Sequence, residues 1–122
     1  MGLRDFAKRL GTSVEELEQE RLHDRFHGMH LTPIAEVEPR RPVHVGGEVV
    51  RTRLTPRSGV QTFEITVSDG TGTIVAMFTG RRHVAGLEHH RAVVLDGVPR
   101  PERGRLVMLN PAYTLLANSG TH

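Results

Sequence analysis

The clearest pattern in this chain is an alternation of apolar and polar side chains in its middle third. Phe63, Ile65 and Val67 fall on one face of an extended chain, and the polar residues between them fall on the other. Such a period of two is typical of a strand with one buried face. The Asp-Gly-Thr-Gly sequence at 69–72 predicts a tight reversal, because Asp-Gly favours the positive φ angles of a hairpin turn. The next strand, at 73–78, is apolar at nearly every residue, so we expect both of its faces to be covered or used.

Shorter apolar runs on either side predict further strands. Valines flank Gly46-Gly47 and indicate a first strand bent by a bulge at the glycine pair. The cluster of turn-forming residues at 55–59 predicts a turn. In chain order, we expect strands at 43–50, 61–68 and 73–78, one helical turn at 81–86, strands at 92–98 and 106–109 separated by a loop at 101–104, and an extended piece at 114–116 that follows a turn at 110–113.

The first 30 residues show helical rather than extended spacing. Apolar residues recur at helical intervals up to Gly11, which is a natural helix stop, and Thr12 or Ser13 can cap a second helix that ends before Gly28. Prolines then punctuate the approach to the strands. We therefore expect a helical extension at 1–30, a linker at 31–42, a body of strands at 43–117 and a frayed tail at 118–122.

Five short strands with a helical turn between the third and the fourth have the order of an OB fold, a partly open Greek-key barrel. The sequence therefore predicts a mainly β protein, a five-stranded Greek-key OB-fold barrel with a short N-terminal helical extension. A generic small β barrel would share the strand count. The position of the helical turn favours the OB fold.

Several segments also resemble the OB-fold nucleic-acid-binding family, namely 45–50, 63–72 and 74–78. The likeness is greatest to the wedge-type OB domain of RecG-like branch-migration helicases. The chain also resembles small stand-alone OB-fold proteins of actinobacteria, which pair a short N-terminal helical segment with this barrel. In that group a Gly-Arg-Arg segment follows the third strand, as at 80–86 here, and Asn-Pro-x-Tyr follows the fifth, as at 110–113.

This resemblance covers residues 34–116 and implies a nucleic-acid-binding domain. It does not extend to a helicase motor, because the chain has no Gly-x-x-x-x-Gly-Lys-Ser/Thr motif. OB barrels also bind proteins and sugars, so the fold by itself does not fix the ligand.

Composition excludes several classes of protein. The 122 residues correspond to one domain of ordinary size. No stretch approaches the roughly 20 apolar residues that span a bilayer, so we expect no membrane partner. The absence of cysteine excludes disulfides, thiolate metal sites and cysteine catalysis. The first residues contain no apolar segment of a secretory signal, and we expect a cytoplasmic protein.

Charge is divided unevenly along the chain. Residues 1–38 carry five basic and eight acidic side chains, a net charge of −3, whereas residues 39–122 carry eleven arginines and six acidic side chains, a net charge of +5. The planar guanidinium of arginine pairs with phosphate through two hydrogen bonds and stacks on bases. A basic body of this kind favours a polyanionic partner.

Eight of the eleven arginines of the body fall where an OB barrel usually holds its ligand, across strands 2 and 3 and between two flanking loops. Each phosphate that they neutralise would release counterions, so such a rim predicts salt-sensitive binding with little sequence preference. The alternative is that solvated loops simply carry charge. The candidate nucleic-acid-binding residues are Arg51, Arg53 and Arg57 at the first loop, Arg81, Arg82 and His83 after the third strand, Arg100, Arg103 and Arg105 at the second loop, and Tyr113.

Aromatic side chains for base stacking are scarce. The body contains only Phe63, Phe78 and Tyr113, and alternation places both phenylalanines on core faces. Val75 and Met77 offer a small apolar surface or pack against the N-terminal helices. Since stacking contributes about 1–3 kcal/mol per base in single-strand binders, we expect weak affinity led by backbone contacts.

Histidines at 23, 27 and 30 raise the question of a metal site. The first two would share one helical face, as zinc ligands do. Gly28 should end the helix before His30, however, and no His-Glu-x-x-His motif is present. We therefore expect no metal and no cofactor.

Two further functions are not favoured. No recognised catalytic spacing links the serine, aspartate and histidine side chains, so we expect no enzyme. Residues 6–17 superficially resemble a helix-turn-helix, but the glutamates of its second helix would repel DNA phosphates.

Two hypotheses of function remain. The first is a non-enzymatic OB-fold protein that contacts single-stranded or branched DNA, or RNA, mainly through an arginine-rimmed groove. The alternative is a protein–protein interaction or oligomerisation module, in which the acidic N-terminal helix within residues 1–28 meets another protein or a second copy of the chain.

Overall fold

The computed structural model describes residues 28–117 together with Leu17 and Phe26. The helical extension predicted for residues 1–30 lies almost entirely outside the described residues, and so does the tail predicted for 118–122.

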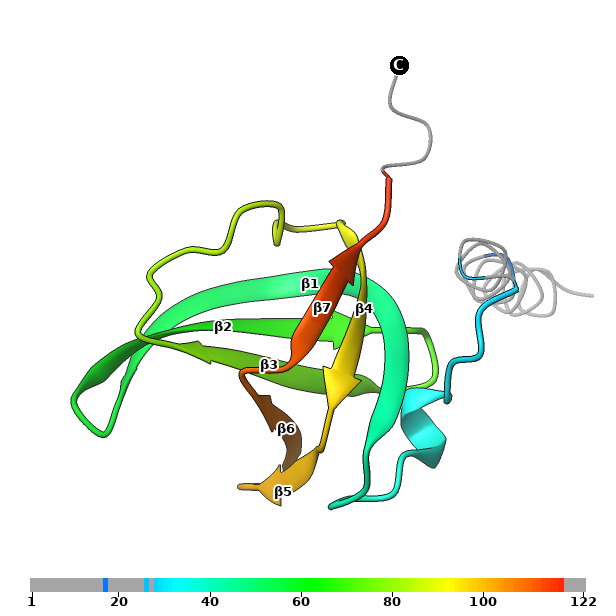
Figure 1. Cartoon of the computed structure of the whole chain (residues 1–122), viewed down its shortest axis with the longest axis horizontal. Helices are drawn as coiled ribbons and strands as arrows, with labels where there is room; N and C mark the ends of the chain where they lie inside the picture. Colours follow the sequence, from blue (N-terminus) through cyan, green and yellow to red (C-terminus); the bar gives the residue numbers. More distant parts are fainter. Residues whose placement is uncertain (1–16, 18–25, 27, 118–122) are drawn as a thin grey trace, which may run out of the picture.

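One short 3-10 helix and seven strands make up the described part of the chain (Figure 1). In chain order they are η1 (Ile34–Glu36), β1 (Val43–Arg57), β2 (Val60–Ser68), β3 (Thr73–Thr79), β4 (Ala92–Gly97), β5 (Arg100–Glu102), β6 (Arg105–Leu109) and β7 (Ala112–Leu115).

All seven strands belong to one curled sheet, in the order β5-β6-β3-β2-β1-β4-β7. β6 pairs in parallel with β3, and β7, which begins after only Asn110 and Pro111, pairs antiparallel with β4. The last run of the chain therefore pairs with the two outer strands of the β3-β2-β1-β4 ribbon, and the sheet curls into a barrel. The predicted count of five strands is wrong, because β5 is an additional short strand and β7 forms where we expected the end of a turn and an unpaired extended piece.

The core fills the inside of this barrel. The predicted alternation in β2 is confirmed, because Phe63, Ile65 and Val67 are all buried there. β3 is buried on both faces, as its continuous apolar run indicated. Its inward side chains join the main core, whereas Val75 and Met77 form a separate small cluster with Val107 on the outer face.

The β1–β2 hairpin is longer and its turn is tighter than predicted, and a second hairpin, β5–β6, includes the residues predicted as a loop. β1 continues to Arg57, so residues 55–57 are strand and not turn. Only Ser58 and Gly59 make the turn, with φ of 51° and 79°. Residues 101–104, predicted as a loop, likewise contain the end of β5 and a two-residue turn. Two-residue turns with positive φ match the twist of antiparallel strands, so the strands continue up to them.

The helical turn predicted at 81–86 is not formed. This part of the loop between β3 and β4 contains a single turn, in which the amide of Leu87 donates to the carbonyl of Val84 at 3.1 Å. Gly80 and Gly86 adopt φ of 75° and 85°, a left-handed geometry that interrupts a helix. Val84 and Leu87 are nevertheless buried in the main core. The loop therefore covers the barrel without a helix.

The carboxylate of Asp69 links the segment before β1 to the turn between β2 and β3 through hydrogen bonds. One carboxylate oxygen accepts hydrogen bonds from the amides of Thr71 and Gly72 at 2.8 and 3.2 Å. The other accepts the amide of Ile34 at 2.8 Å, and Ile34 is only 3% exposed in the core. The sequence Asp-Gly-Thr-Gly thus forms the predicted tight reversal, with Gly70 at φ 88°, and also anchors η1.

The glycine pair of β1 allows close packing and is not the site of the bulge. The register between β1 and β2 shifts between Val49 and Arg51, so the bulge lies at Val50. A Cβ at Gly46 would come within 2.6 Å of a methyl of Leu31 and 2.9 Å of the ring of Phe26. At Gly47 it would collide with the backbone carbonyl of Ser68. Gly46 therefore makes room for side chains, and Gly47 makes room for a neighbouring strand.

Replacing each glycine with alanine should separate these two roles. We expect Gly47→Ala to lower the free energy of unfolding by about 1–3 kcal/mol, since a strand backbone cannot move aside cheaply. Gly46→Ala should cost less, because the ends of the Phe26 and Leu31 side chains can shift. Urea denaturation of both variants measures the difference, and equal losses would contradict this assignment.

Candidate nucleic-acid interface

Strand pairing decides which arginines share a face of the sheet. Arg53 lies opposite Glu64, which lies opposite Met77, so these side chains form one row across β1, β2 and β3. Arg51 starts the neighbouring row, which ends at Arg100 on β5. Because side chains alternate along a strand, both rows lie on the outer face of the barrel, opposite to the core.

Two glutamates bind the arginines of this face. Glu64 is only 3% exposed and forms ion pairs with Arg53 at 3.2 Å and Arg105 at 3.3 Å. Glu102 accepts two hydrogen bonds from Arg57, at 2.6 and 3.0 Å, and lies 3.7 Å from Arg100. The Arg57–Glu102 pair joins the β1–β2 hairpin to the β5–β6 hairpin.

The Arg57–Glu102 pair changes the pKa of both groups. The hydrogen bonds and the positive charge of Arg57 lower the pKa of Glu102 below its ordinary value of 4.5, and partial burial only partly opposes this shift. The same hydrogen bonds raise the pKa of Arg57. Both groups are therefore charged at neutral pH. The two side chains are 28% and 23% exposed, so water screens the pair only in part.

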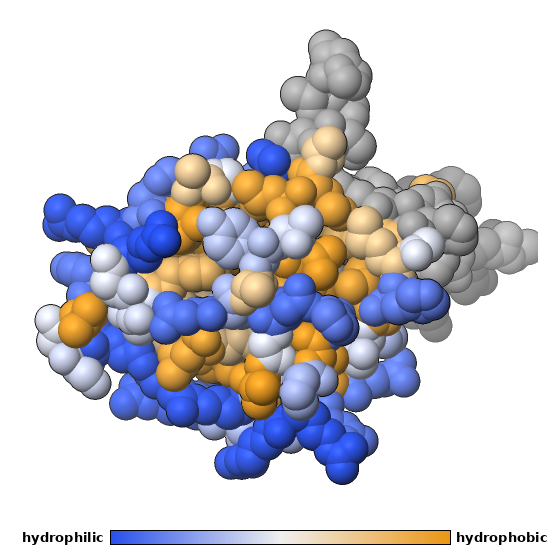
Figure 2. Space-filling model, viewed as in Figure 1, coloured by the Kyte–Doolittle hydropathy of each residue, from blue (hydrophilic) through white to orange (hydrophobic). Residues whose placement is uncertain are grey.

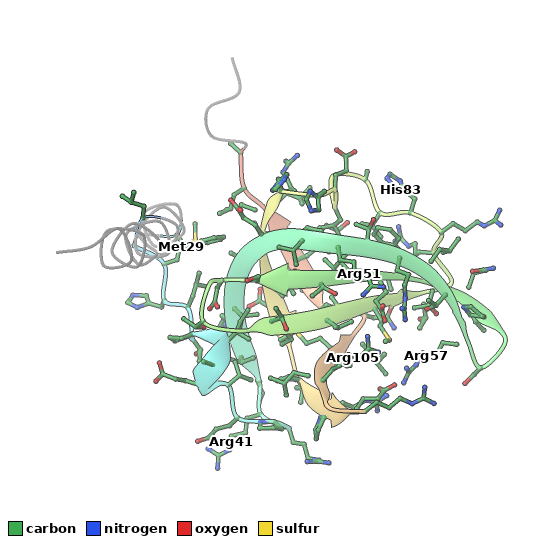
Figure 3. All side chains as sticks on the ribbon, turned by 180° about the vertical axis from the view of Figure 1, so that it is seen from behind. Met29, Arg41, Arg51, Arg57, His83 and Arg105 are labelled. Atoms are coloured by element: carbon green, nitrogen blue, oxygen red, sulfur yellow. The ribbon has the colours of Figure 1, made fainter. Side chains whose placement is uncertain are left out.

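A cavity of about 410 Å³ lies between the two hairpins. Figure 3 shows Arg57 and Arg105 on the same side of the sheet, and both line this cavity. Its lining residues are Arg53, Thr55, Pro56, Arg57, Ser58, Glu64, Met77, Glu102, Arg103 and Arg105.

Six of the ten candidate residues therefore converge. We call them the arginine face: Arg51, Arg53, Arg57, Arg100, Arg103 and Arg105. Two glutamates, Glu64 and Glu102, oppose these six charges. Arg51 and Arg103 form no ion pair within the part of the chain that the structure describes. The arginine face keeps an excess of positive charge after all its ion pairs are counted.

The other four candidates do not join this face. The ring of His83 packs edge-on against that of Phe63, with 6.0 Å between the ring centroids. The ring of Tyr113 packs in the same way against that of Phe78, with 5.6 Å between the centroids. Both phenylalanines belong to the core side of the sheet, and Figure 3 shows His83 on the opposite side of the sheet from Arg57 and Arg105. Arg81 and Arg82 precede His83 in an exposed loop and do not line the cavity.

The side of the molecule that carries β7 is less polar. In Figure 2, apolar residues form much of the surface around β7, whereas hydrophilic side chains gather toward β5. Tyr113 belongs to this side and is 39% exposed. The predicted groove is thus two surfaces, one rich in arginine and one containing His83 and Tyr113.

Sequence reasoning missed the two glutamates that organise the arginine face. Alternation in β2 already placed Glu64 on the polar face of its strand, so its position opposite Arg53 could have been predicted from the sequence. Glu102 carried no such signal, because its partner Arg57 lies 45 residues away.

The described residues contain no cluster of three or more His, Asp or Glu side chains suited to a metal ion. Two of the histidines considered above, His23 and His27, lie outside the described residues. No helix within the described ranges is long and apolar enough to cross a membrane.

Comparison with known proteins identifies the fold and not the family. No family model matches the sequence, and no curated protein matches it. Among solved structures, an OB domain from Methanosarcina mazei is similar to this chain with a TM-score of 0.56 and 18% identity, over 72% of this chain and 84% of that one. An OB domain from Thermoplasma acidophilum has a TM-score of 0.54 and 17% identity, over 75% and 92% of the two chains. The described residues therefore form an OB fold.

The Arg57–Glu102 pair should make stability depend on pH. Because the pKa of Glu102 is lowered in the folded protein, its contribution is complete above about pH 4.5 and is lost as the pH falls through the lowered pKa. We expect Glu102→Gln to be less stable than the wild type by about 1 kcal/mol near neutral pH. Well below the ordinary pKa, the two proteins should converge. Urea denaturation across this range measures the effect, and a difference that does not change with pH would contradict it.

Proposed function

We propose that this chain is a non-enzymatic OB-fold module that binds single-stranded or branched DNA, or RNA, through the arginine face. The observation that carries the proposal is the convergence of six arginines, from β1 and from the β5–β6 hairpin, on the outer face of the barrel, where four of them line one cavity. OB folds usually hold oligonucleotides across this face, between the two hairpins that flank it.

The chemistry of the arginine face suits a phosphate backbone better than bases. A guanidinium can donate two parallel hydrogen bonds to one phosphate, and Arg51 and Arg103, which form no ion pair within residues 28–117, can do so. The apolar part of this face is small. It consists of the buried cluster of Val75, Met77 and Val107 and of Leu109, which pairs with Met77 and is 36% exposed. Without an aromatic platform among the cavity-lining residues, affinity would come mainly from counterion release and would fall steeply with salt.

The candidates outside the arginine face, Arg81, Arg82, His83 and Tyr113, would contact a ligand that passes around the end of the sheet. The amide of Gly80 donates to the carbonyl of Gln61 at 2.8 Å, so the loop that carries Arg81, Arg82 and His83 begins beside the β1–β2 hairpin. A long single strand or a branched nucleic acid could reach both surfaces. A short oligonucleotide would occupy only the arginine face.

The alternative function, a protein-interaction module, depends on residues 1–28, nearly all of which lie outside the described residues. No contact among the described residues favours it. We further propose that the protein works in the cytoplasm, where nucleic acid is accessible.

Removing the unpaired arginines should weaken binding without weakening the fold. We expect Arg51→Ala and Arg103→Ala each to lower affinity for a labelled oligo(dT), and each to reduce the slope of log affinity against log salt by about 0.7, the value for one phosphate contact on a single strand. Their unfolding free energies should stay within about 0.5 kcal/mol of the wild type. Fluorescence anisotropy at several salt concentrations measures affinity and slope.

Arg41→Ala is the matched control. Arg41 is exposed, pairs only with Glu38 within the described part of the chain, and lies far from Arg57 in Figure 3. The substitution Arg41→Ala removes the same charge as Arg51→Ala or Arg103→Ala and should leave the salt slope unchanged. Parallel titrations with forked DNA and with RNA identify the preferred nucleic acid. Absence of binding to all three at low salt would refute the proposed function.

A further inference from the structure

Glu102 holds Arg57 in the geometry by which arginine usually binds a phosphate. The two guanidinium nitrogens of Arg57 donate to the two oxygens of one carboxylate, at 2.6 and 3.0 Å. A phosphodiester offers two oxygens to the same fork. Glu102 is also shared with Arg100 and lines the cavity that separates the two hairpins. The carboxylate thus stands where a backbone phosphate would be held.

We propose that Glu102 occupies a phosphate-binding subsite of Arg57 in the free protein, and that a phosphodiester of the bound nucleic acid displaces it. This inference rests on the proposed function of the arginine face. It assigns Glu102 the role of an intramolecular competitor, which keeps Arg57 ordered but unavailable until a polyanion arrives. Two negative groups would repel each other at this site, so the phosphate and the carboxylate exclude one another.

Glu102 is placed to leave, whereas Glu64 is not. Glu102 is the last residue of β5, a three-residue strand at the edge of the sheet that pairs only with β6. It directly precedes the two-residue turn at Arg103 and Gly104. Glu64 lies in the middle of β2, is almost completely buried and is held by Arg53 and Arg105 on two strands. Movement of the short hairpin therefore releases Glu102 and leaves Glu64 in place.

Arg57 keeps a second contact when Glu102 leaves. Its Nη1 lies 3.4 Å from the sulfur of Met77, on β3. This contact holds the guanidinium over the sheet. Once Glu102 has moved, the Arg57 fork points into the cavity beside Arg53 and Arg105. The subsite is therefore preorganised for a phosphate.

The test is a double-mutant cycle on the full chain, followed by anisotropy with a labelled oligo(dT) of about 16 nucleotides, the upper site size for one OB fold. Glu102→Gln removes the competitor and should tighten binding about fivefold, the factor expected for the loss of one such ion pair. Arg57→Ala should cost little affinity in the wild-type background. It should cost much more in the Glu102→Gln background, where Arg57 is available to the ligand.

Glu38→Gln is the matched control for net charge. It also removes a carboxylate from an arginine, since Glu38 pairs with Arg41, but both groups are exposed and lie outside the arginine face. It should change affinity by much less than Glu102→Gln. Glu102→Ala offers a second way of removing the carboxylate and should also tighten binding.

The outcomes separate this inference from the proposed function. If the wild type binds in a salt-dependent manner but Glu102→Gln and Glu102→Ala bind equally or more weakly, Glu102 only supports the fold and the inference fails. The inference also fails if Glu38→Gln gives the same gain, or if Arg57→Ala has the same effect in both backgrounds. If neither the wild type nor Glu102→Gln binds at low salt, the proposed function itself fails.

Discussion

The pairing of the last run of the chain with both β3 and β4 decides which residues meet on the outer face of the barrel. β6 pairs in parallel with β3. After a break of two residues, β7 pairs antiparallel with β4. This closure bends the sheet and brings the β5–β6 hairpin toward the β1–β2 hairpin. Arg57 and Glu102, which are 45 positions apart in the sequence, thereby come within hydrogen-bond distance. The cavity, its arginines and its glutamates are consequences of how the barrel closes.

The arginine face combines fixed and available charge. Burial of Glu64 would be costly for an isolated carboxylate, and the two arginines beside it offset that cost. The buried Glu64 in turn holds the guanidinium groups of Arg53 and Arg105 close to the sheet. Arg51 and Arg103 make no such pair among the described residues. We infer a division of labour, in which the paired arginines are preorganised and the unpaired ones make the first contact with a polyanion.

The sequence was sufficient for features that depend on local pattern, such as the alternation in β2 and the turn at Asp69. It predicted the OB fold from the order of the strands, although the helical turn that favoured this fold is absent at 81–86. It failed where tertiary contact decides. Gly46-Gly47 indicated a bulge because glycine is common at bulges. Gly47 instead leaves room for the backbone carbonyl of Ser68 on the neighbouring strand. All ten candidate residues were expected in one groove, but the loop after β3 places His83 against Phe63, on the core side of the sheet.

The most direct test of the arginine face is an NMR titration of the isotope-labelled full chain with oligo(dT), read on the backbone amides and on the Nε–Hε signals of the arginines. The account predicts that the largest shifts come from β1, β2, β3 and the β5–β6 hairpin, with the side-chain signals of Arg51 and Arg103 among them. Shifts confined to β4 and β7, which carry none of the arginine face, would contradict it.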